Sequence, residues 1–129
     1  MNAKNYHVVI VITGQKILKE QTSFELLVEF EELFYAHFLL VTFLDSLEHE
    51  EKGASKVIHL NKKDSKDQKE LEKHAKLADL VVCVGLSDKE KESLQMFFEG
   101  LPTDSQIIKI EDETGMNRSL RELINRFND

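Results

Sequence analysis

Cysteine, proline and glycine are scarce in this chain of 129 residues, and each scarcity narrows what the protein can be. Cys83 is the only cysteine, so neither an internal disulfide nor an all-thiolate metal site can form within one chain. Pro102 is the only proline, and the five glycines are scattered singly, so no linker rich in these residues divides the sequence. We therefore expect one domain covering residues 1–129.

Long hydrophobic runs are also missing. No apolar stretch approaches the roughly 18 residues that a membrane span needs, and the N-terminus lacks the pattern of a secretory signal. Seventeen Lys and Arg against twenty-four Asp and Glu give a net charge of -7, which disfavours nucleic acid as the main partner. This net charge does not exclude a local basic patch. We expect a cytoplasmic protein that binds neither membranes nor nucleic acid.

Short apolar runs rich in β-branched residues predict five strands. Three runs are continuous, at residues 7–13, 38–44 and 80–84, a fourth lies at 106–110, and a weaker fifth lies at 56–60. Continuous apolar runs are typical of strands that are covered on both faces. The pattern therefore favours a mainly parallel sheet between two layers of helices.

Helix signals separate these runs. Ser87 and Glu90 have the spacing of a capping box. Apolar residues then recur with helical spacing at Leu94, Phe97, Phe98 and Leu101. A second set with this spacing, after Asn117 or Ser119 as the cap, is Leu120, Leu123, Ile124 and Phe127. A third helix opens at Ser65 and should lie on the surface, because its apolar stripe is thin: Leu71, Ala75 and Ala78.

The helix expected at residues 22–37 has an unusually wide apolar surface. Thr22 and Glu25 have capping-box spacing. The apolar residues cover more than half of the cylinder: Phe24, Leu26, Leu27, Val28, Phe30, Leu33, Phe34 and Phe38. Either this helix is sandwiched between the sheet and a neighbouring helix or the chain end, or its exposed part forms the interface of a homodimer.

Strands that alternate with helices predict an α/β fold, a three-layer sandwich with a five-stranded sheet that is flavodoxin-like or Rossmann-like. We expect the strand order 2-1-3-4-5. Residues 45–55 form either a short helix or a charged loop. In such sheets ligands bind beyond the carboxyl ends of the strands. The residues that directly follow each predicted strand are therefore the candidate binding residues.

The loop after the first strand is the leading candidate site and contains Thr13, Gly14, Gln15 and Lys16. About eight residues would separate the strand from a helix that begins at Thr22, more than is usual for such a connection. Gly14 permits close approach of the backbone, Thr13 offers a hydroxyl, and Lys16 offers a cation for a phosphate. The alternative is that Thr13 and Gly14 simply end a buried strand.

Later strand ends supply further candidates. Gly85 permits a tight turn and Ser87 opens a helix beside the same crevice, although capping alone explains Ser87. Asp45 follows the second strand, where a carboxylate can accept ribose hydroxyls or simply cap a turn. Residues 61–63 and 111–113 follow two other strands.

Complete catalytic motifs are absent. The sequence contains neither GxGxxG nor GxxxxGK[ST], and its histidines lack the spacing of zinc ligands. Cys83 lies mid-strand among valines, which is typical of a core position. His59, near a strand end, is the best single acid–base candidate. Whether the protein catalyses a reaction stays open.

Two partial likenesses accompany this pattern. The stretch 8–14 (VVIVITG), a long helix after it, and the later strand 79–82 with its turn at Ser87 are similar to the flavoprotein family that includes cysteine decarboxylases and the flavin-binding subunit of dipicolinate synthase. This resemblance implies flavin mononucleotide at the first loop, with Gln15 where the family has a small hydroxyl residue. Residues 78–110 resemble a strand-helix-strand piece of two-domain glycosyltransferases.

Two functions follow from these features. We expect a protein that holds a phosphate-bearing small molecule, FMN or a nucleotide, at the carboxyl edge of its sheet. The alternative is a non-catalytic interaction or regulatory module that associates through helix 22–37. No metal site is expected.

Overall fold

The computed structural model describes residues 8–16, 21–32, 38–44, 56–62 and 65–127. Its sheet has five strands, all parallel: β1 (Val9–Thr13), β2 (Phe38–Thr42), β3 (Lys56–His59), β4 (Leu80–Val84) and β5 (Gln106–Ile110). The helices in the described ranges are α1 (Gln21–Glu32), α2 (Ser65–Leu77), α3 (Asp88–Ser93), α4 (Gln95–Glu99) and α5 (Glu113–Phe127), with a short 3-10 turn, η4 (Leu60–Lys62), after β3. The predicted α/β class and the parallel sheet are confirmed.

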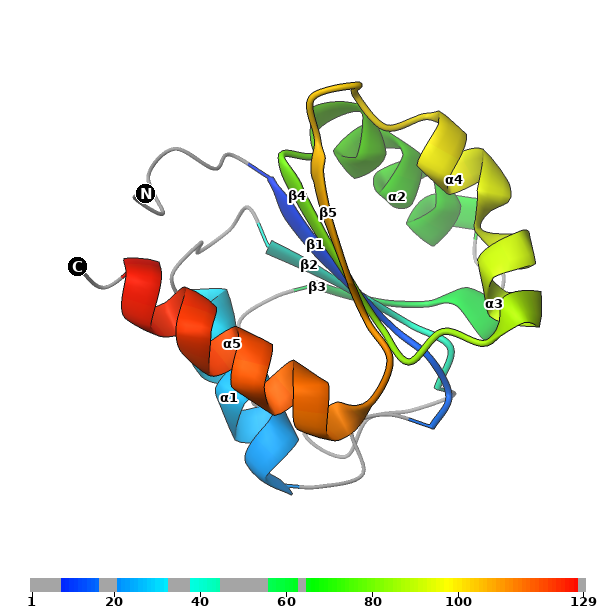
Figure 1. Ribbon diagram of the computed structural model, residues 1–129. Coiled ribbons are helices and arrows are strands. Elements are labelled where there is room, and N and C mark those ends of the chain that lie inside the picture. Colours follow the sequence, from blue (N-terminus) through cyan, green and yellow to red (C-terminus); the bar gives the residue numbers. More distant parts are fainter. Residues whose placement is uncertain (1–7, 17–20, 33–37, 45–55, 63–64, 128–129) are drawn as a thin grey trace.

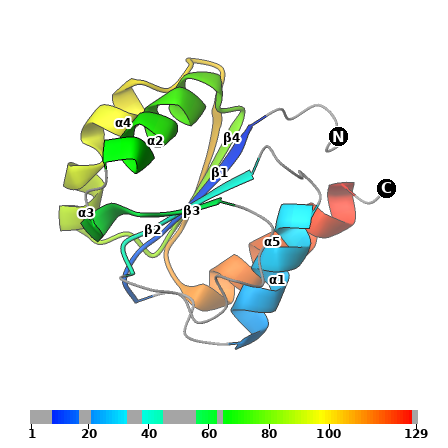
Figure 2. The same ribbon diagram turned by 180° about the vertical axis from the view of Figure 1, so that it is seen from behind.

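Helices cover both faces of the sheet, as Figures 1 and 2 show from opposite sides. On one face α1 and α5 pack against Val9 and Val11 of β1, and on the other α2 and the α3–α4 segment pack against Ile10 and Ile12. Successive side chains of a strand point to opposite faces, so a strand buried on both sides must be apolar throughout. This requirement explains the continuous apolar runs.

The predicted strand order was wrong. The observed order is β3-β2-β1-β4-β5, with β1 in the centre, in place of 2-1-3-4-5. β1, β2 and β4 are buried at every position, whereas every residue of β5 is at least partly exposed. A strand at the edge keeps one flank open to solvent and tolerates polar residues, which the lysines and glutamine of β3 and β5 reflect.

Two helices near the C-terminal end of the chain differ from the prediction in their boundaries. The helix after Ser87 is interrupted at Leu94, which is buried and separates α3 from α4. α5 begins at Glu113 and not after Asn117 or Ser119, because the Asp112 carboxylate accepts the backbone N–H of Gly115 at 2.6 Å and caps it earlier.

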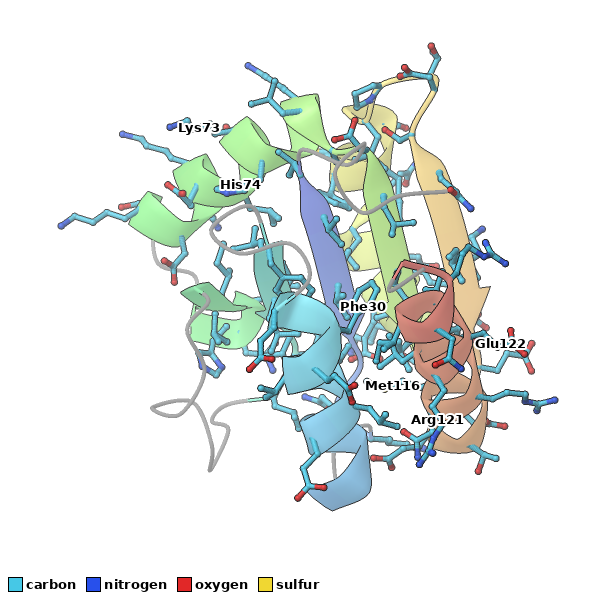
Figure 3. The ribbon with its side chains drawn as sticks, turned by 90° about the vertical axis from the view of Figure 1, so that its left-hand side faces the viewer. Phe30, Lys73, His74, Met116, Arg121 and Glu122 are labelled. Carbon is cyan, nitrogen blue, oxygen red and sulfur yellow. The ribbon has the colours of Figure 1, made fainter. Side chains whose placement is uncertain are left out.

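The described part of α1 is a sandwiched helix. It begins at Gln21, one residue before the expected start, and Leu26, Leu27 and Phe30 are buried against the sheet and α5. Figure 3 shows Phe30 and Met116 between α1 and α5. The outer face carries three exposed carboxylates, those of Glu25, Glu29 and Glu32.

Several residues of the expected helix 22–37 cannot be placed with it. Phe38, which the sequence placed both in the apolar set of that helix and at the start of the strand run 38–44, is the first residue of β2, so its assignment to the strand is confirmed. Leu33 and Phe34 lie outside the described residues, as does the segment 45–55. Within the described ranges, no helix combines the length and the apolar character that crossing a bilayer requires.

Candidate functional site

The winding of the sheet reverses between β1 and β4. From β1 the chain proceeds outward to β2 and β3, and after α2 it returns to β4 on the other side of β1. The two loops that leave the carboxyl ends of β1 and β4 therefore diverge to opposite sides of the sheet. In open α/β sheets this reversal is the place where a ligand-binding crevice forms.

A cleft of about 540 Å³ lies at this reversal. All five strands contribute to its walls at their carboxyl ends. The lining residues are Gln15 and Lys16 after β1, Phe43 after β2, Asn61 after β3, Gly85, Leu86, Ser87, Lys89, Glu90 and Ser93 after β4, and Glu111 after β5. The volume falls in the range of small-molecule sites.

Thr13 does not face this cleft. Its side chain is completely buried, and its hydroxyl donates a hydrogen bond of 2.9 Å to the hydroxyl of Thr42 on the neighbouring strand. The Thr42 oxygen also accepts the backbone N–H of Leu44 at 3.0 Å. The pair holds the carboxyl ends of β1 and β2 together, so Thr13 supports the wall of the cleft instead of offering a hydroxyl to a ligand.

Gly14 and Gly85 form a close crossing of two backbones. The N–H of Gly14 donates to the carbonyl of Val84 at 2.9 Å, and a Cβ at Gly14 would lie 2.2 Å from the carbonyl oxygen of Gly85. Gly85 has a φ of 61°, in the left-handed region that favours glycine. The predicted close approach at Gly14 is therefore made by the protein's own backbone, which fixes the two loops at the winding reversal.

The carboxylate of Glu90 joins these two loops. One oxygen accepts the backbone N–H of Ser87 at 2.9 Å, and the other accepts the backbone N–H of Gln15 at 3.2 Å. The Ser87 hydroxyl in turn accepts the N–H of Glu90 at 3.2 Å, which completes the predicted capping box. Two N–H groups that a bound anion would otherwise use are thus satisfied by a side chain of the protein.

Replacing Glu90 by glutamine is expected to lower the free energy of unfolding by about 1 kcal/mol, since an amide retains only one acceptor for two backbone donors. Urea denaturation measures the change. Glu92→Gln removes the same charge from an exposed position of the same helix and should change stability by less than about 0.5 kcal/mol. Equal effects of the two substitutions would show that Glu90 does not hold the loops.

Lys16 and Lys89 bring positive charge to the cleft. Lys16 follows β1 and is exposed, and Lys89 is exposed on α3. Glu111, which follows β5, also lines the cleft and adds a negative charge. Of the other predicted site residues, Gln15, Gly85 and Ser87 line the cleft, and Asp45 lies outside the described residues.

A second hollow, of about 880 Å³, lies between the α3–α4 segment and β5. Its walls are apolar below and charged at the rim, and they include Leu86 and Glu111, which also line the cleft. Cys83 is at the inner wall and is only 4% exposed, as expected for a core residue. Burial raises the pKa of this thiol to about 11, against the weaker opposing effects of Lys109 and Lys91, so the thiol is neutral at pH 7.

His59 has a structural hydrogen bond. The residue is 5% exposed, and Nδ1 lies 2.8 Å from the carbonyl oxygen of Leu44, a geometry in which Nδ1 carries the proton. His59 is absent from the cleft lining. Among the residues that the structure describes, no three His, Cys, Asp or Glu side chains gather in a way that would hold a metal ion.

Sequence reasoning missed part of the site. Lys89, Ser93 and Phe43 line the cleft without having been singled out. The spacing of Ser87 and Glu90 disclosed the capping box, but the contact between Glu90 and Gln15 spans 75 residues and has no local signal. Positions one turn into the helix after a strand deserve consideration in such folds, because they face the same crevice.

The fold and its cleft define a class: a doubly wound parallel α/β protein with a pocket where the winding reverses. Comparisons of the chain with protein-family models, with curated proteins and with solved structures give no match.

Proposed function

We propose that this protein binds a phosphate-bearing small molecule, a nucleotide or FMN, in the cleft at the winding reversal. The observation that carries the proposal is that the carboxyl ends of all five strands meet around one hollow of about 540 Å³. Five converging chain segments can surround a small molecule on several sides, and doubly wound sheets bind their ligands at this position.

The ammonium groups of Lys16 and Lys89 are the groups that would attract the phosphate. The backbone N–H groups of Gln15 and Ser87 are already bonded to Glu90, so side chains and not the loop backbone supply the positive charge. Hydrogen bonds between charged partners are among the stronger ones in proteins. The carboxylate of Glu111 can accept hydrogen bonds from the hydroxyls of a sugar.

The proposed ligand is a metabolite of the cytoplasm, the compartment we expect for a chain whose single cysteine can form no internal disulfide. The alternative of association through α1 has less support. Of the residues of that helix whose burial is described, Leu26, Leu27 and Phe30 are buried, Val28 is half-buried, and the exposed ones are glutamates.

Calorimetric titration with FMN, ATP and NAD tests the proposal. We expect at least one of them to bind, and we expect Lys16→Ala or Lys89→Ala to weaken its binding about tenfold, the effect of losing one charged hydrogen bond. Lys73→Ala is the matched control, since Lys73 is exposed on α2 and lines neither hollow. Absence of binding for all three compounds at millimolar concentration, or equal affinity in the Lys16→Ala, Lys89→Ala and Lys73→Ala variants, would refute the proposal.

A further inference from the structure

The hollow beside β5 exists because the helices stop short of the edge of the sheet. In the parallel pairing of β4 with β5, Val81 lies beside Ile107 and Cys83 lies beside Lys109. Val81 and Cys83 belong to the core under α2, α3 and α4. Ile107 points to the same face but remains 42% exposed. We call this hollow the β5 groove; apolar atoms form its floor, at Leu86, Phe98 and Ile107.

The β5 groove adjoins the cleft. Leu86 and Glu111 line both hollows, so these two residues form a shared boundary. The cleft has lysines for a phosphate, and the groove has an apolar floor for a part of a molecule that avoids water. A molecule that carries both kinds of group would have to extend past Leu86 and Glu111 to place its phosphate in the cleft and its apolar part in the groove.

The polar rim of the β5 groove restricts which kind of chemical group can bind over its apolar floor. Gln95 donates to Glu99 at 3.2 Å, and Lys91 and Lys109 add charged donors, so polar groups surround the apolar floor. Phe98, one of the floor residues, packs edge-on against Phe97, with ring centroids 5.4 Å apart, and this contact orients its ring. A flat ring with heteroatoms at its edge satisfies both the floor and the rim, whereas an alkyl chain satisfies the floor alone.

We infer that the β5 groove is the subsite for the heteroaromatic ring of the ligand, a purine or a flavin, whose phosphate lies in the cleft. This inference rests on the proposed function. It adds a second set of contacts, from α4 and β5, that the residues of the β1 and β4 loops do not provide. The groove of about 880 Å³ is large enough for either ring system.

Titrations that separate the ring from the phosphate test the inference, with AMP and FMN as complete probes and ribose 5-phosphate as the probe without a ring. We expect AMP or FMN to bind at least tenfold more tightly than ribose 5-phosphate. In amide NMR spectra the complete probe should shift the resonances of Ile107 and Lys109, and ribose 5-phosphate should shift only those near Lys16.

A pair of substitutions provides the second measurement. Ile107→Asp places a charge on the floor of the groove and should weaken binding of the complete probe at least tenfold without changing the affinity for ribose 5-phosphate. Met96→Asp is the control, because Met96 is 85% exposed on α4 and outside the groove. Circular dichroism verifies that both variants fold.

The outcomes distinguish the two proposals. If ribose 5-phosphate binds as tightly as AMP and FMN and no groove resonance moves, the ring subsite is wrong and the phosphate cleft stands. If a complete probe depends on Ile107 but not on Lys16 or Lys89, the groove binds the ring and the proposed phosphate site is wrong. If no probe binds, both proposals fail.

Discussion

Alanine in place of Gly14 is expected to lower the free energy of unfolding by about 3 kcal/mol, the upper part of the usual range for overpacking. The new Cβ would lie 2.2 Å from the carbonyl oxygen of Gly85 and 2.9 Å from a carboxylate oxygen of Glu90. The Gly85 oxygen belongs to a backbone that is itself held by a 2.8 Å bond from its N–H to the carbonyl of Ile110. The ends of β1 and β4 would have to separate.

Gly100→Ala is the matched control for this substitution. Gly100 has a φ of -83°, and the nearest atom to an added Cβ is 3.5 Å away, an ordinary contact. Alanine there should leave stability unchanged or raise it by about 0.5 kcal/mol, because it restricts the unfolded chain. Chemical denaturation compares the stabilities of the two variants. A Gly14→Ala protein as stable as the Gly100→Ala protein would contradict the close backbone contact between Gly14 and Gly85.

Alanine in place of Phe30 is expected to destabilise the protein by about 4 kcal/mol. Phe30 is completely buried where α1 meets the sheet and α5, and its ring meets that of Phe38 edge-on at a centroid distance of 6.0 Å. The substitution removes the largest side chain among the fully buried ones and leaves a cavity that three elements border. A loss of this size is a large part of the 5–15 kcal/mol that stabilises a typical domain.

Thermal or urea unfolding measures the effect of Phe30→Ala. Leu77→Ala is a suitable comparison, since Leu77 is 60% exposed at the end of α2 and should contribute less than about 0.5 kcal/mol. A loss below 2 kcal/mol for Phe30→Ala would mean that α1 is not anchored by this side chain. In that case the interpretation of α1 as a sandwiched helix would also weaken.

The substitutions at Phe30 and Gly14 should differ in their effect on the proposed ligand binding. Phe30 stabilises a layer remote from the cleft, so its loss should lower stability without a specific effect on ligand affinity. Gly14 lies in the junction that also contains Gly85 and Glu90. Strain at this junction would displace Gln15 and Lys16, so Gly14→Ala should weaken ligand binding even at temperatures where the variant remains folded.

Local sequence determined the elements and the class of the fold. The apolar runs contain all five observed strands, and helix starts at Ser65 and after Ser87 agree with the cap residues that predicted them. These features depend on contacts within a few residues or on the apolar character of a strand, both of which can be read along the chain. Even the edge positions of β3 and β5 had a signal, because their runs are weaker or carry exposed polar residues.

Only the tertiary structure decided which strands are neighbours and what the candidate residues contact. Strand order depends on long-range pairing, which burial patterns restrict but do not specify. The same limit applies to the site: Thr13 bonds to Thr42, Gly14 meets Gly85, and Glu90 reaches Gln15. The chemistry of each side chain was legible in the sequence, but whether a group faces a ligand or another part of the protein depends on distances that exist only once the chain has folded.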